Sequence, residues 1–521
     1  MKNVLRTLVA VVLALGVTFA AAQRVVGAPK STPSPAATNT GTPAPLPSAT
    51  PEGPDTAIPR LEAKIKDNPS DKDALQELAG YYLQVGKNDQ SLALTQRLIS
   101  LGVKTAQVYF LDGVANQSLG RIKDATDDFE QATTQEPTNA QILLTLTTLY
   151  LQTNRASDAE RVAKRATTFN PSDKRVFENY GLVLGQEQKF DDARTQFEIA
   201  AKLDPKDATP VVLEARSYVS QKAIALAEQD FDRALTIDPK SPDALLGKAS
   251  LQAGNHDVKG AIATFETLLG VETDDDSRAS VIIQEYEVYR DEKMNDEALA
   301  ALKRAEAAYP NSAGVHLAYG DYDVSIGKDQ AAGEAEWKQA LGPARDNPQA
   351  LDRLGELSMV QNKKSDALGY FKRLAEVVPN DAQVLGKLGQ VQNDNNQFAD
   401  ARTSFLQSFQ LQHTPSALAG LGQADLQLKN YKECNQVFGA IDKSATDFFK
   451  QYPQDLYVYG KCAVAVSDKN TARGAFTRFK AYVKPGSPLA NEVNKMLASL
   501  GSGGSSAPSP SPKPQHSPSS H

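Results

Sequence analysis

The sequence predicts an all-α protein, a solenoid of about twelve helical hairpins closed at its C-terminal end by a capping helix. Three observations predict this fold class. A small residue recurs at steps of 34 residues, phenylalanines stand four residues after it, and prolines stand twelve residues after it. Aromatic residues make up only 7% of the 521 residues, while alanine, leucine, glutamine and aspartate recur throughout. A fixed period of this size is typical of stacked repeats, in which each unit buries its apolar face against the next.

The N-terminal segment, residues 1–22, has the pattern of a secretory signal peptide. Lys2 and Arg6 precede an uncharged run from Leu8 to Ala22 that ends in three alanines, and a small-residue ending of this kind is typical of a cleavage site. The run is shorter than the ~20 apolar residues that span a membrane, which favours cleavage and export to the periplasm or cell envelope. If the segment is not cleaved, it anchors the protein to the membrane, and this alternative stays open.

Two low-complexity segments flank the predicted repeats. Residues 23–57 are rich in proline, serine and threonine, and residues 501–521 are rich in glycine, serine and proline. Such compositions offer too few apolar side chains to form a core, so we expect a disordered linker and a disordered tail. The solenoid is therefore predicted to occupy residues 58–500.

The repeat is most visible in residues that share one position in successive units. The small residue is Ala125, Ala159, Ala193, Ala227 and Ala261, with Phe129, Phe197, Phe231 and Phe265 and then Pro137, Pro171, Pro205 and Pro239 in the same register. Apolar residues three and four apart predict one buried stripe on each helix. Small residues let the two helices of a hairpin approach, and the phenylalanine is expected to fill the wider gap toward the next hairpin. Proline ends the second helix because it lacks an N–H.

These spacings resemble the tetratricopeptide repeat family, whose 34-residue unit is a pair of antiparallel helices. The small residue at position 8 of the family's unit is matched by Ala79, Gly113, Thr147, Gly181, Ala215, Ala249, Gly320, Gly355, Gly389, Gly422 and Gly460. Units in this register begin near Lys72, Ala106, Ala140, Lys174, Ala208, Pro242, Ala279, Ala313, Pro348, Ala382, Pro415 and Pro453. The resemblance implies a right-handed superhelix that binds other proteins.

The pattern changes at its ends and at two internal positions. Leu61 and Ile65 predict a half-unit before the first repeat, and an amphipathic stretch around Val493 predicts the final capping helix. Tyr286 stands where a small residue is expected, and the unit from Ala313 needs a one-residue shift to bring Trp337 to the phenylalanine position. We expect altered helix packing in these two units.

Charge and motifs argue against several function classes. The formal net charge is −7 and no long run of Lys and Arg occurs, so nucleic acid is not an expected partner. No H-E-x-x-H, G-x-x-x-x-G-K-[ST] or G-x-S-x-G motif is present. The run Asp274–Asp276 lacks the ligand spacing of a calcium loop and is expected to start a helix. We predict no catalytic, metal-binding or cofactor-binding residues and no cofactor; an enzyme subunit whose chemistry resides in a partner is the alternative.

Cys434 and Cys462 are the only cysteines, 28 residues apart. In an exported protein an even number of cysteines favours a disulfide, and the register puts these two on neighbouring helices. The alternative is that Cys434 fills a small-residue position and Cys462 is a buried apolar side chain.

The resemblance also implies a binding groove on the concave face, formed by exposed positions of the first helices. In register these are Leu83, Phe110, Val114, Leu144, Leu151, Leu182, Val212, Val219 and Leu246, followed by Ile283, Glu287, Asp291, Asp321, Asp352 and Glu356. Such a groove, apolar first and acidic later, favours a peptide or helix with basic residues and apolar anchors. Alternatively, the acids serve solubility and some of the leucines close the core between repeats. Family members that hold acidic chaperone tails use Lys and Asn where this chain has Gln76 and Gly80, so that clamp is absent.

The predicted function is a non-catalytic scaffold or adaptor of the periplasm or cell envelope that holds partner peptides or helices on its concave face. The alternative is a membrane-tethered assembly or secretion factor with an uncleaved N-terminal anchor. The sequence does not predict an oligomeric state.

Overall fold

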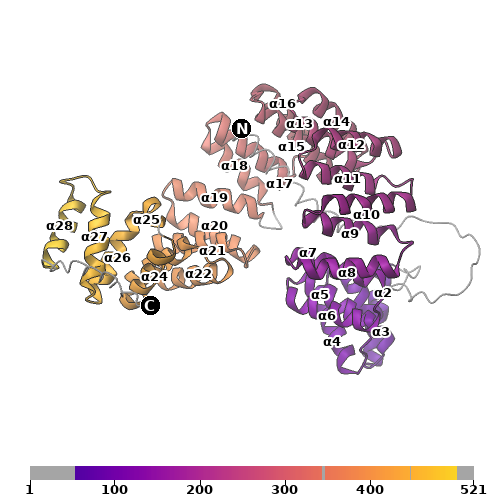
Figure 1. Cartoon of the computed structure of the whole chain (residues 1–521), viewed down its shortest axis with the longest axis horizontal. Coiled ribbons are helices and arrows are strands. Elements are labelled where there is room, and N and C mark those ends of the chain that lie inside the picture. Colours follow the sequence, from indigo (N-terminus) through magenta and orange to yellow (C-terminus); the bar gives the residue numbers. More distant parts are fainter. Residues whose placement is uncertain (1–52, 343–346, 446, 502–521) are drawn as a thin grey trace, which may run out of the picture. The chain divides into compact units, whose positions relative to one another are not determined.

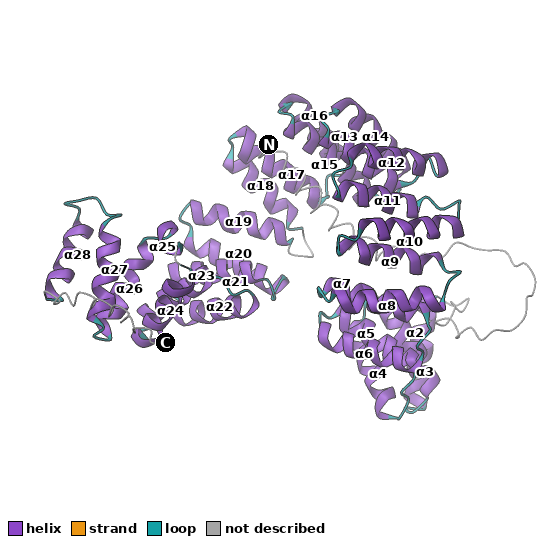
Figure 2. Cartoon of the chain, viewed as in Figure 1, coloured by secondary structure: helices purple, strands orange, loops and turns teal. Residues whose placement is uncertain are grey.

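The protein folds into paired helices along the whole of its described length. The computed structural model describes residues 53–342, 347–445 and 447–501, and every regular element in these ranges is helical (Figure 2). The predicted signal peptide, nearly all of the predicted linker and all of the predicted tail except Gly501 lie outside these ranges. The chain divides into two compact units at residues 294 and 295, coloured indigo to magenta and salmon to yellow in Figure 1. Each unit is described by itself.

Unit 1 contains six complete hairpins with one helix before them and one after. Its helices are α2 (Pro54–Asp67), α3 (Lys72–Gln84), α4 (Asn88–Ser100), α5 (Ala106–Ser118), α6 (Ile122–Gln135), α7 (Ala140–Gln152), α8 (Ala156–Phe169), α9 (Lys174–Gln186), α10 (Phe190–Leu203), α11 (Thr209–Ser220), α12 (Ile224–Ile237), α13 (Pro242–Gly254), α14 (Val258–Val271) and α15 (Asp275–Asp291).

Unit 2 contains five complete hairpins, a helix before them and a capping helix after them. Its elements are α16 (Asn295–Ala308), α17 (Ala313–Tyr322), the π-helical turn η2 (Asp323–Gly327), α18 (Gln330–Ala340), α19 (Pro348–Val360), α20 (Lys364–Val377), α21 (Ala382–Asp394), α22 (Phe398–Leu411), α23 (Pro415–Gln427), α24 (Tyr431–Ser444), α25 (Phe448–Gln451), α26 (Gln454–Ala465), α27 (Lys469–Lys480) and α28 (Pro488–Ser499). The described ranges thus contain eleven complete hairpins within the two units, while α15 and α16, the two helices of the unit predicted from Ala279, fall in different units.

The first helices begin where the repeat register places them, because most carry a capping side chain just before their first residue. Asn139, for example, accepts hydrogen bonds from the backbone N–H groups of Gln141 and Ile142, with N–O distances of 3.0 and 3.3 Å. The same contact is made by Asp71, Thr105, Asp173, Ser241, Asp274, Asn347, Asp381 and Thr414. A cap of this type satisfies backbone donors that the first turn leaves free.

The structured region starts earlier than predicted. Helix α2 begins at Pro54, inside the segment expected to be linker, and Ala57 and Leu61 are fully buried against the first hairpin. Proline suits the first turn of a helix because its missing N–H has no partner there anyway. Because residues 23–57 are rich in proline, the sequence predicted a linker at the residues where α2 begins.

Glycine at position 8 is explained by the phenylalanine sixteen residues later. A Cβ atom on Gly181 would lie 2.7 Å from Cδ1 of Phe197, and one on Gly113 would lie 2.7 Å from Cε1 of Phe129. The phenylalanine was expected to fill the gap toward the next hairpin. In the hairpins of Gly113 and Gly181 it also presses against the first helix of its own hairpin, so glycine leaves room for the ring there. Ala215 and Ala249 stand at the same position opposite Phe231 and Phe265, so glycine is required only where the ring lies this close.

Most turns between first and second helices contain a non-glycine residue in the left-handed region. Gly86 and Gly120 take this position in the first two hairpins, but Asn154, Gln188 and Lys222 take it in the next three, with φ of 57, 61 and 60°. The left-handed conformation costs an L-residue roughly 1–2 kcal/mol relative to the helical one. These turns therefore carry a small strain that glycine would remove.

The two repeats with irregular sequence patterns, which were predicted to begin at Ala279 and Ala313, each pack differently from the other repeats. Helix α15 starts at Asp275, with Asp274 as its cap, and buries Tyr286 at 2% exposure where other units have a small residue. In the hairpin from Ala313, Trp337 follows Gly320 by seventeen residues, and η2 takes up the extra residue as a single wide turn. The predicted one-residue shift thus has a physical cause.

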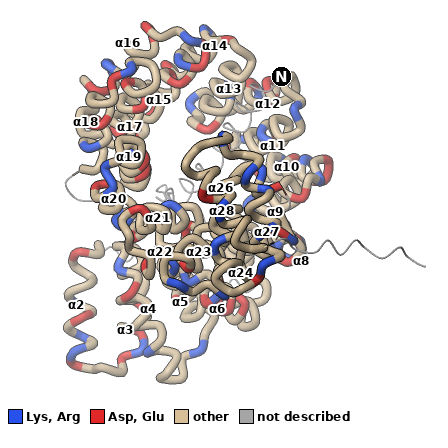
Figure 3. The backbone as a smooth tube through the Cα atoms, turned by 90° about the vertical axis from the view of Figure 1, so that its left-hand side faces the viewer, with Lys and Arg blue, Asp and Glu red and all other residues tan. Residues whose placement is uncertain are grey.

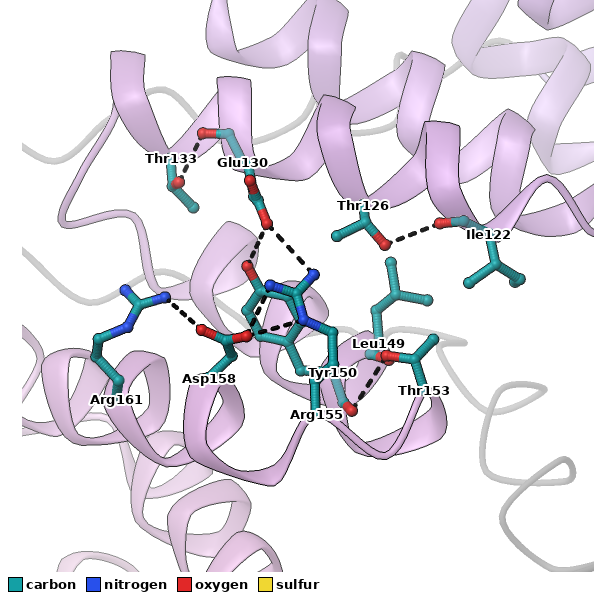
Figure 4. A network of polar contacts seen from close by, with 10 residues as sticks. All are labelled: Ile122, Thr126, Glu130, Thr133, Leu149, Tyr150, Thr153, Arg155, Asp158 and Arg161. Atoms are coloured by element: carbon teal, nitrogen blue, oxygen red, sulfur yellow. Dashed lines mark hydrogen bonds and ion pairs between the residues drawn. The ribbon is translucent and has the colours of Figure 1, made fainter.

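Tyrosine–glutamate pairs join successive helices at several points. Tyr150 of α7 donates to Glu130 of α6 over 2.6 Å, and the guanidinium of Arg155 lies 4.3 Å from the centre of the Tyr150 ring (Figure 4). Tyr82 of α3 donates in the same way to Glu62 of α2. Burial, together with this hydrogen bond to Glu62, raises the pKa of Tyr82 to about 12. Because each pair spans two elements, it fixes their mutual position.

The C-terminal end of unit 2 is closed by a disulfide and a cap. Cys434 of α24 and Cys462 of α26 are bonded, with both residues fully buried and their Cα atoms 5.9 Å apart. Helix α28 then covers the last hairpin with Val493, and Tyr457 donates to Glu492 over 2.5 Å. A polar outer side on such a helix keeps the end of a stack in water.

Candidate protein-binding face

The first helices of neighbouring hairpins in unit 1 line one side of the stack. Helix α3 contacts α5, α7 contacts α9, α9 contacts α11, and α11 contacts α13. We define the first-helix face as the surface formed by positions 2, 5, 9, 12 and 13 of the units that begin at Lys72, Ala106, Ala140, Lys174, Ala208 and Pro242. These positions recur at three- and four-residue intervals, so they lie on one side of each helix.

The structure places the predicted apolar groove residues at different depths. Phe110, Leu151, Val212 and Val219 are buried, at 8, 8, 2 and 8% exposure, and belong to the cores between helices. The expectation that they form an exposed groove is therefore wrong for these four. In a tight stack, neighbouring first helices lie so close that their apolar side chains cover one another.

The remaining predicted apolar residues are half-buried and keep part of their surface at the face. They are Leu83, Val114, Leu144, Leu182, Leu246 and Ile283. Val114 and Leu144 pack against the largest core cluster of unit 1 on their inner side. The first-helix face thus exposes the edges of apolar side chains rather than a deep apolar channel.

The predicted acidic part of the groove is mostly neutralised by the chain itself. In unit 2, Asp321 accepts from Arg353 at 2.8 and 3.1 Å, and also from the indole N–H of Trp337. Lys387 donates to both Asp352 and Glu356, at 2.5 and 2.7 Å. Three carboxylates therefore share two cations, so most of the negative charge that would attract a basic ligand is already compensated within the chain.

The two acids of this set that belong to unit 1 lie on α15. Glu287 and Asp291 are exposed, and Arg290 donates to Asp291 over 2.9 Å. Charged residues of both signs are scattered along the helices of both units without a block of one sign (Figure 3).

The middle of the first-helix face carries amides and hydroxyls in place of charges. Helix α7 contains no charged residue, and the face positions of α5 are Gln107, Phe110, Val114, Gln117 and Ser118. Position 13 is exposed and uncharged in all six hairpins, as Gln84, Ser118, Gln152, Gln186, Ser220 and Gly254. The amide of Gln117 donates to Gln152 of the next hairpin over 3.3 Å. Amides both donate and accept, so this row can pair with the backbone of an extended chain.

Glu178 is the acidic residue next to this uncharged region, while Arg175 and Arg216 are the charged face residues of the opposite sign on α9 and α11. It occupies position 5 of α9, between Leu144 and Val212 at the same position of the preceding and following hairpins. Its Oε1 atom is buried without a hydrogen-bond partner among the described residues. Burial, assisted by the nearby carboxylate of Asp207, raises the pKa of Glu178 to about 7.

The cations nearest to Glu178 are engaged elsewhere. Lys174 donates to Asp204 over 2.7 Å and is also paired with Asp207, while Arg175 pairs with Asp173 over 2.7 Å. The chain therefore leaves the Glu178 carboxylate without a close positive partner.

Comparison with known families agrees with the geometry of the stacked hairpins. One family model described as tetratricopeptide repeat matches residues 118–178 and 218–281, and a second with the same description matches residues 180–242 and 353–417. The chain is a tetratricopeptide repeat protein. No curated protein matches it.

Solved structures similar to this tetratricopeptide repeat protein align with part of it. YrrB, described as a TPR protein with an unusual peptide-binding site, is 23% identical; the match covers 36% of this chain and 95% of YrrB, with a TM-score of 0.31. A tetratricopeptide repeat protein from Parabacteroides merdae is 17% identical, with 49% and 98% covered and a TM-score of 0.35. The pilF protein of Pseudomonas aeruginosa is 17% identical, with 42% and 96% covered and a TM-score of 0.32.

A second acidic group in this repeat protein lies away from the first-helix face. Asp112 of α5 pairs with the hydroxyl of Thr95, and Asn116 donates to Asp128 of α6 over 2.8 Å. Burial is the largest cause that raises the pKa of Asp128 to about 7, and the nearby Asp112 contributes. Within the described ranges, no group of three or more His, Cys, Asp or Glu residues could hold a metal ion. No described helix has the length and apolar content needed to cross a membrane.

The register alone could have pointed to Glu178. It stands 34 residues after Leu144 and 34 before Val212, both of which the register had placed in the groove. The missing signal was the environment of its carboxylate, because a sequence does not show which neighbouring cations are already paired.

Proposed function

We propose that this tetratricopeptide repeat protein is a non-catalytic scaffold that holds an extended segment of a partner protein on the first-helix face of unit 1. The observation that carries the proposal is the exposed row of uncharged residues at position 13, beside half-buried leucines at positions 5 and 9. A partner strand gains hydrogen bonds from the amides and apolar contact from the leucine edges, without removing charged groups from water.

The proposed location is the periplasm or cell envelope. It rests on the N-terminal pattern of Lys2, Arg6 and the uncharged run to Ala22, which is typical of export. In the alternative, a membrane-tethered assembly or secretion factor, the same segment stays attached as an anchor. The intact mass of the protein purified from its host separates the two, because cleavage removes the N-terminal residues.

The test of the binding face uses added charge at exposed residues, which leaves the core intact. The double variant Gln152→Glu and Gln186→Glu places two carboxylates on the face, and Gln131→Glu with Gln229→Glu adds the same charge on the second helices α6 and α12. All four glutamines are exposed. Each form serves as bait in a crosslinking pull-down from the native host, followed by mapping of the crosslinked peptides.

The proposal predicts one partner crosslinked to α7 or α9 that the face variant loses and the matched control keeps. If the partner persists with the face variant, or if its crosslinks map to second helices, the first-helix face is not the binding surface. Circular dichroism of each variant verifies that helix content is unchanged.

A further inference from the structure

We propose that Glu178 is the cation-recognition residue of the first-helix face, and that the partner segment carries one lysine or arginine between uncharged residues. This rests on the proposed function, since it specifies the ligand of the same face. The chemistry of the partner follows from three features of the surroundings of Glu178.

The first feature is an excess of hydrogen-bond acceptors with no donor to match them. Oε1 of Glu178 and Oδ1 of the adjacent Asn179 are both buried and unpartnered within the described residues. A buried acceptor without a partner costs free energy, and a buried carboxylate costs more than a neutral group. A ligand that supplies N–H donors and positive charge removes both costs.

The second feature is that the residue is accessible although one oxygen is covered. Glu178 as a whole is only partly buried, and the terminal torsion of a glutamate side chain rotates with little preference. A small rotation therefore presents the carboxylate to a ligand that lies across α7, α9 and α11.

The third feature is that the neighbouring positions select uncharged residues on both sides of the cation. On one side, α7 contributes Leu144 and Thr148. On α9, Leu182 lies one turn after Glu178, and on the other side Val212 of α11 is buried. A second charge on the ligand would lie against these groups without a partner, since Arg216, one turn after Val212, already donates to Asp243 over 2.6 Å. One cation in an uncharged frame is therefore the best complement.

The experiment compares three peptide pools by fluorescence anisotropy with the full chain. Each pool has acetylated and amidated ends, flanks of mixed uncharged residues, and lysine, glutamine or glutamate at its centre; the capped ends remove terminal charges. At pH 8.5 we expect the lysine pool to bind about tenfold more tightly than the glutamine pool. This difference in affinity is what a charge-assisted hydrogen bond from lysine to a desolvated carboxylate provides. The glutamate pool should bind most weakly.

Two variants assign the preference to one carboxylate. Glu178→Gln keeps the shape of the side chain and should abolish the lysine preference while binding of the glutamine pool remains. Glu228→Gln changes an exposed glutamate on the second helix α12 and should leave the preference intact. In the wild type the preference should also shrink at pH 5.5, because the pKa of Glu178 is about 7, with Lys174, Arg175, Asp173 and Asp207 as its charged neighbours.

Equal binding of the lysine and glutamine pools, or a lysine preference that survives Glu178→Gln, would overturn this inference and leave the proposed binding face standing. A failure of every pool to bind would overturn both. If labelled protein associates with unlabelled protein through the same face, and Glu178→Gln prevents it, the occupant is a second copy of this chain and the inference is wrong.

Discussion

Adding one methyl group to α9 should have opposite effects at two glycines that lie one turn apart. At Gly181 the new Cβ atom would lie 2.7 Å from Cδ1 and 2.8 Å from Cζ of Phe197, whereas at Gly185 it would meet no atom within 4 Å. Both residues are helical, so the gain from replacing glycine by alanine is similar at the two sites. Only the packing of the aromatic ring distinguishes them.

The magnitudes follow from two opposing effects. Alanine is favoured over glycine inside a helix by about 1 kcal/mol. Overpacking of a tight core costs about 1–3 kcal/mol, and Phe197 is 2% exposed in a close-packed cluster with Leu184 and Ala193, so its ring has little space to move. The cost at Gly181 is therefore taken at the upper end, about 3 kcal/mol, and after the gain of about 1 kcal/mol Gly181→Ala should lower the free energy of unfolding by about 2 kcal/mol. Gly185→Ala, which has only the gain, should raise it by about 1 kcal/mol.

Hydrogen exchange of the α9 and α10 amides is the suitable assay, because a repeat array can open locally before it unfolds as a whole. A change of about 1.4 kcal/mol alters the protection of these amides tenfold. Gly181→Ala should reduce protection and Gly185→Ala should increase it. If both variants increase protection, Phe197 yields to the added methyl group and the explanation of the position-8 glycines is wrong.

Three further predictions follow from polar and covalent contacts. Tyr150→Phe removes the hydrogen bond to Glu130 and should cost about 1 kcal/mol in urea unfolding; no change would mean that water replaces the hydroxyl without loss. The double variant Cys434→Ala, Cys462→Ala removes the disulfide that closes a 28-residue loop and should lower the stability of the C-terminal hairpins by about 3 kcal/mol. The measurement is hydrogen exchange of these hairpins in the variant and in the oxidised parent protein. Equal protection of their amides in the two proteins would refute the prediction. Folding raises the pKa of Glu178 from 4.5 to about 7, so the unfolded chain loses this proton first and the stability of the protein falls as pH rises between these two values. Glu178→Gln should therefore stabilise the protein by about 2 kcal/mol at pH 8 and by nothing below pH 4. A stability difference that does not depend on pH would contradict this prediction.

The hairpin order could be predicted from the sequence because its signals are local. Proline, a capping side chain and a small residue at position 8 repeat in nearly every unit, and each acts within a few residues of its own place. The first helices therefore begin at or within a residue of the predicted positions in eleven of the twelve units, for example at Lys72, Ala140 and Pro415. Helix α15 starts one turn early because Asp274, and not a residue nearer Ala279, forms the cap.

The binding residues were harder to predict, because exposure depends on neighbouring helices. The repeat register identified Phe110 and Val212 as groove positions, but close contact between first helices buries them. The register also indicated an acidic stretch, yet Lys387 reaches Asp352 and Glu356 from a unit more than thirty residues away.

The all-helical repeat, the length of its unit and the places where the pattern is interrupted can be read from the residues alone, since helix starts, turns and small-residue contacts are set by nearby residues. Which leucines remain at the surface, and which carboxylates are already paired, became known only from the packing of the helices. These properties depend on the distance between helices and on the reach of long side chains across them, which the order of residues does not contain. Glu178 is the clearest case, because its unpaired carboxylate is defined by what Lys174 and Arg175 bind instead.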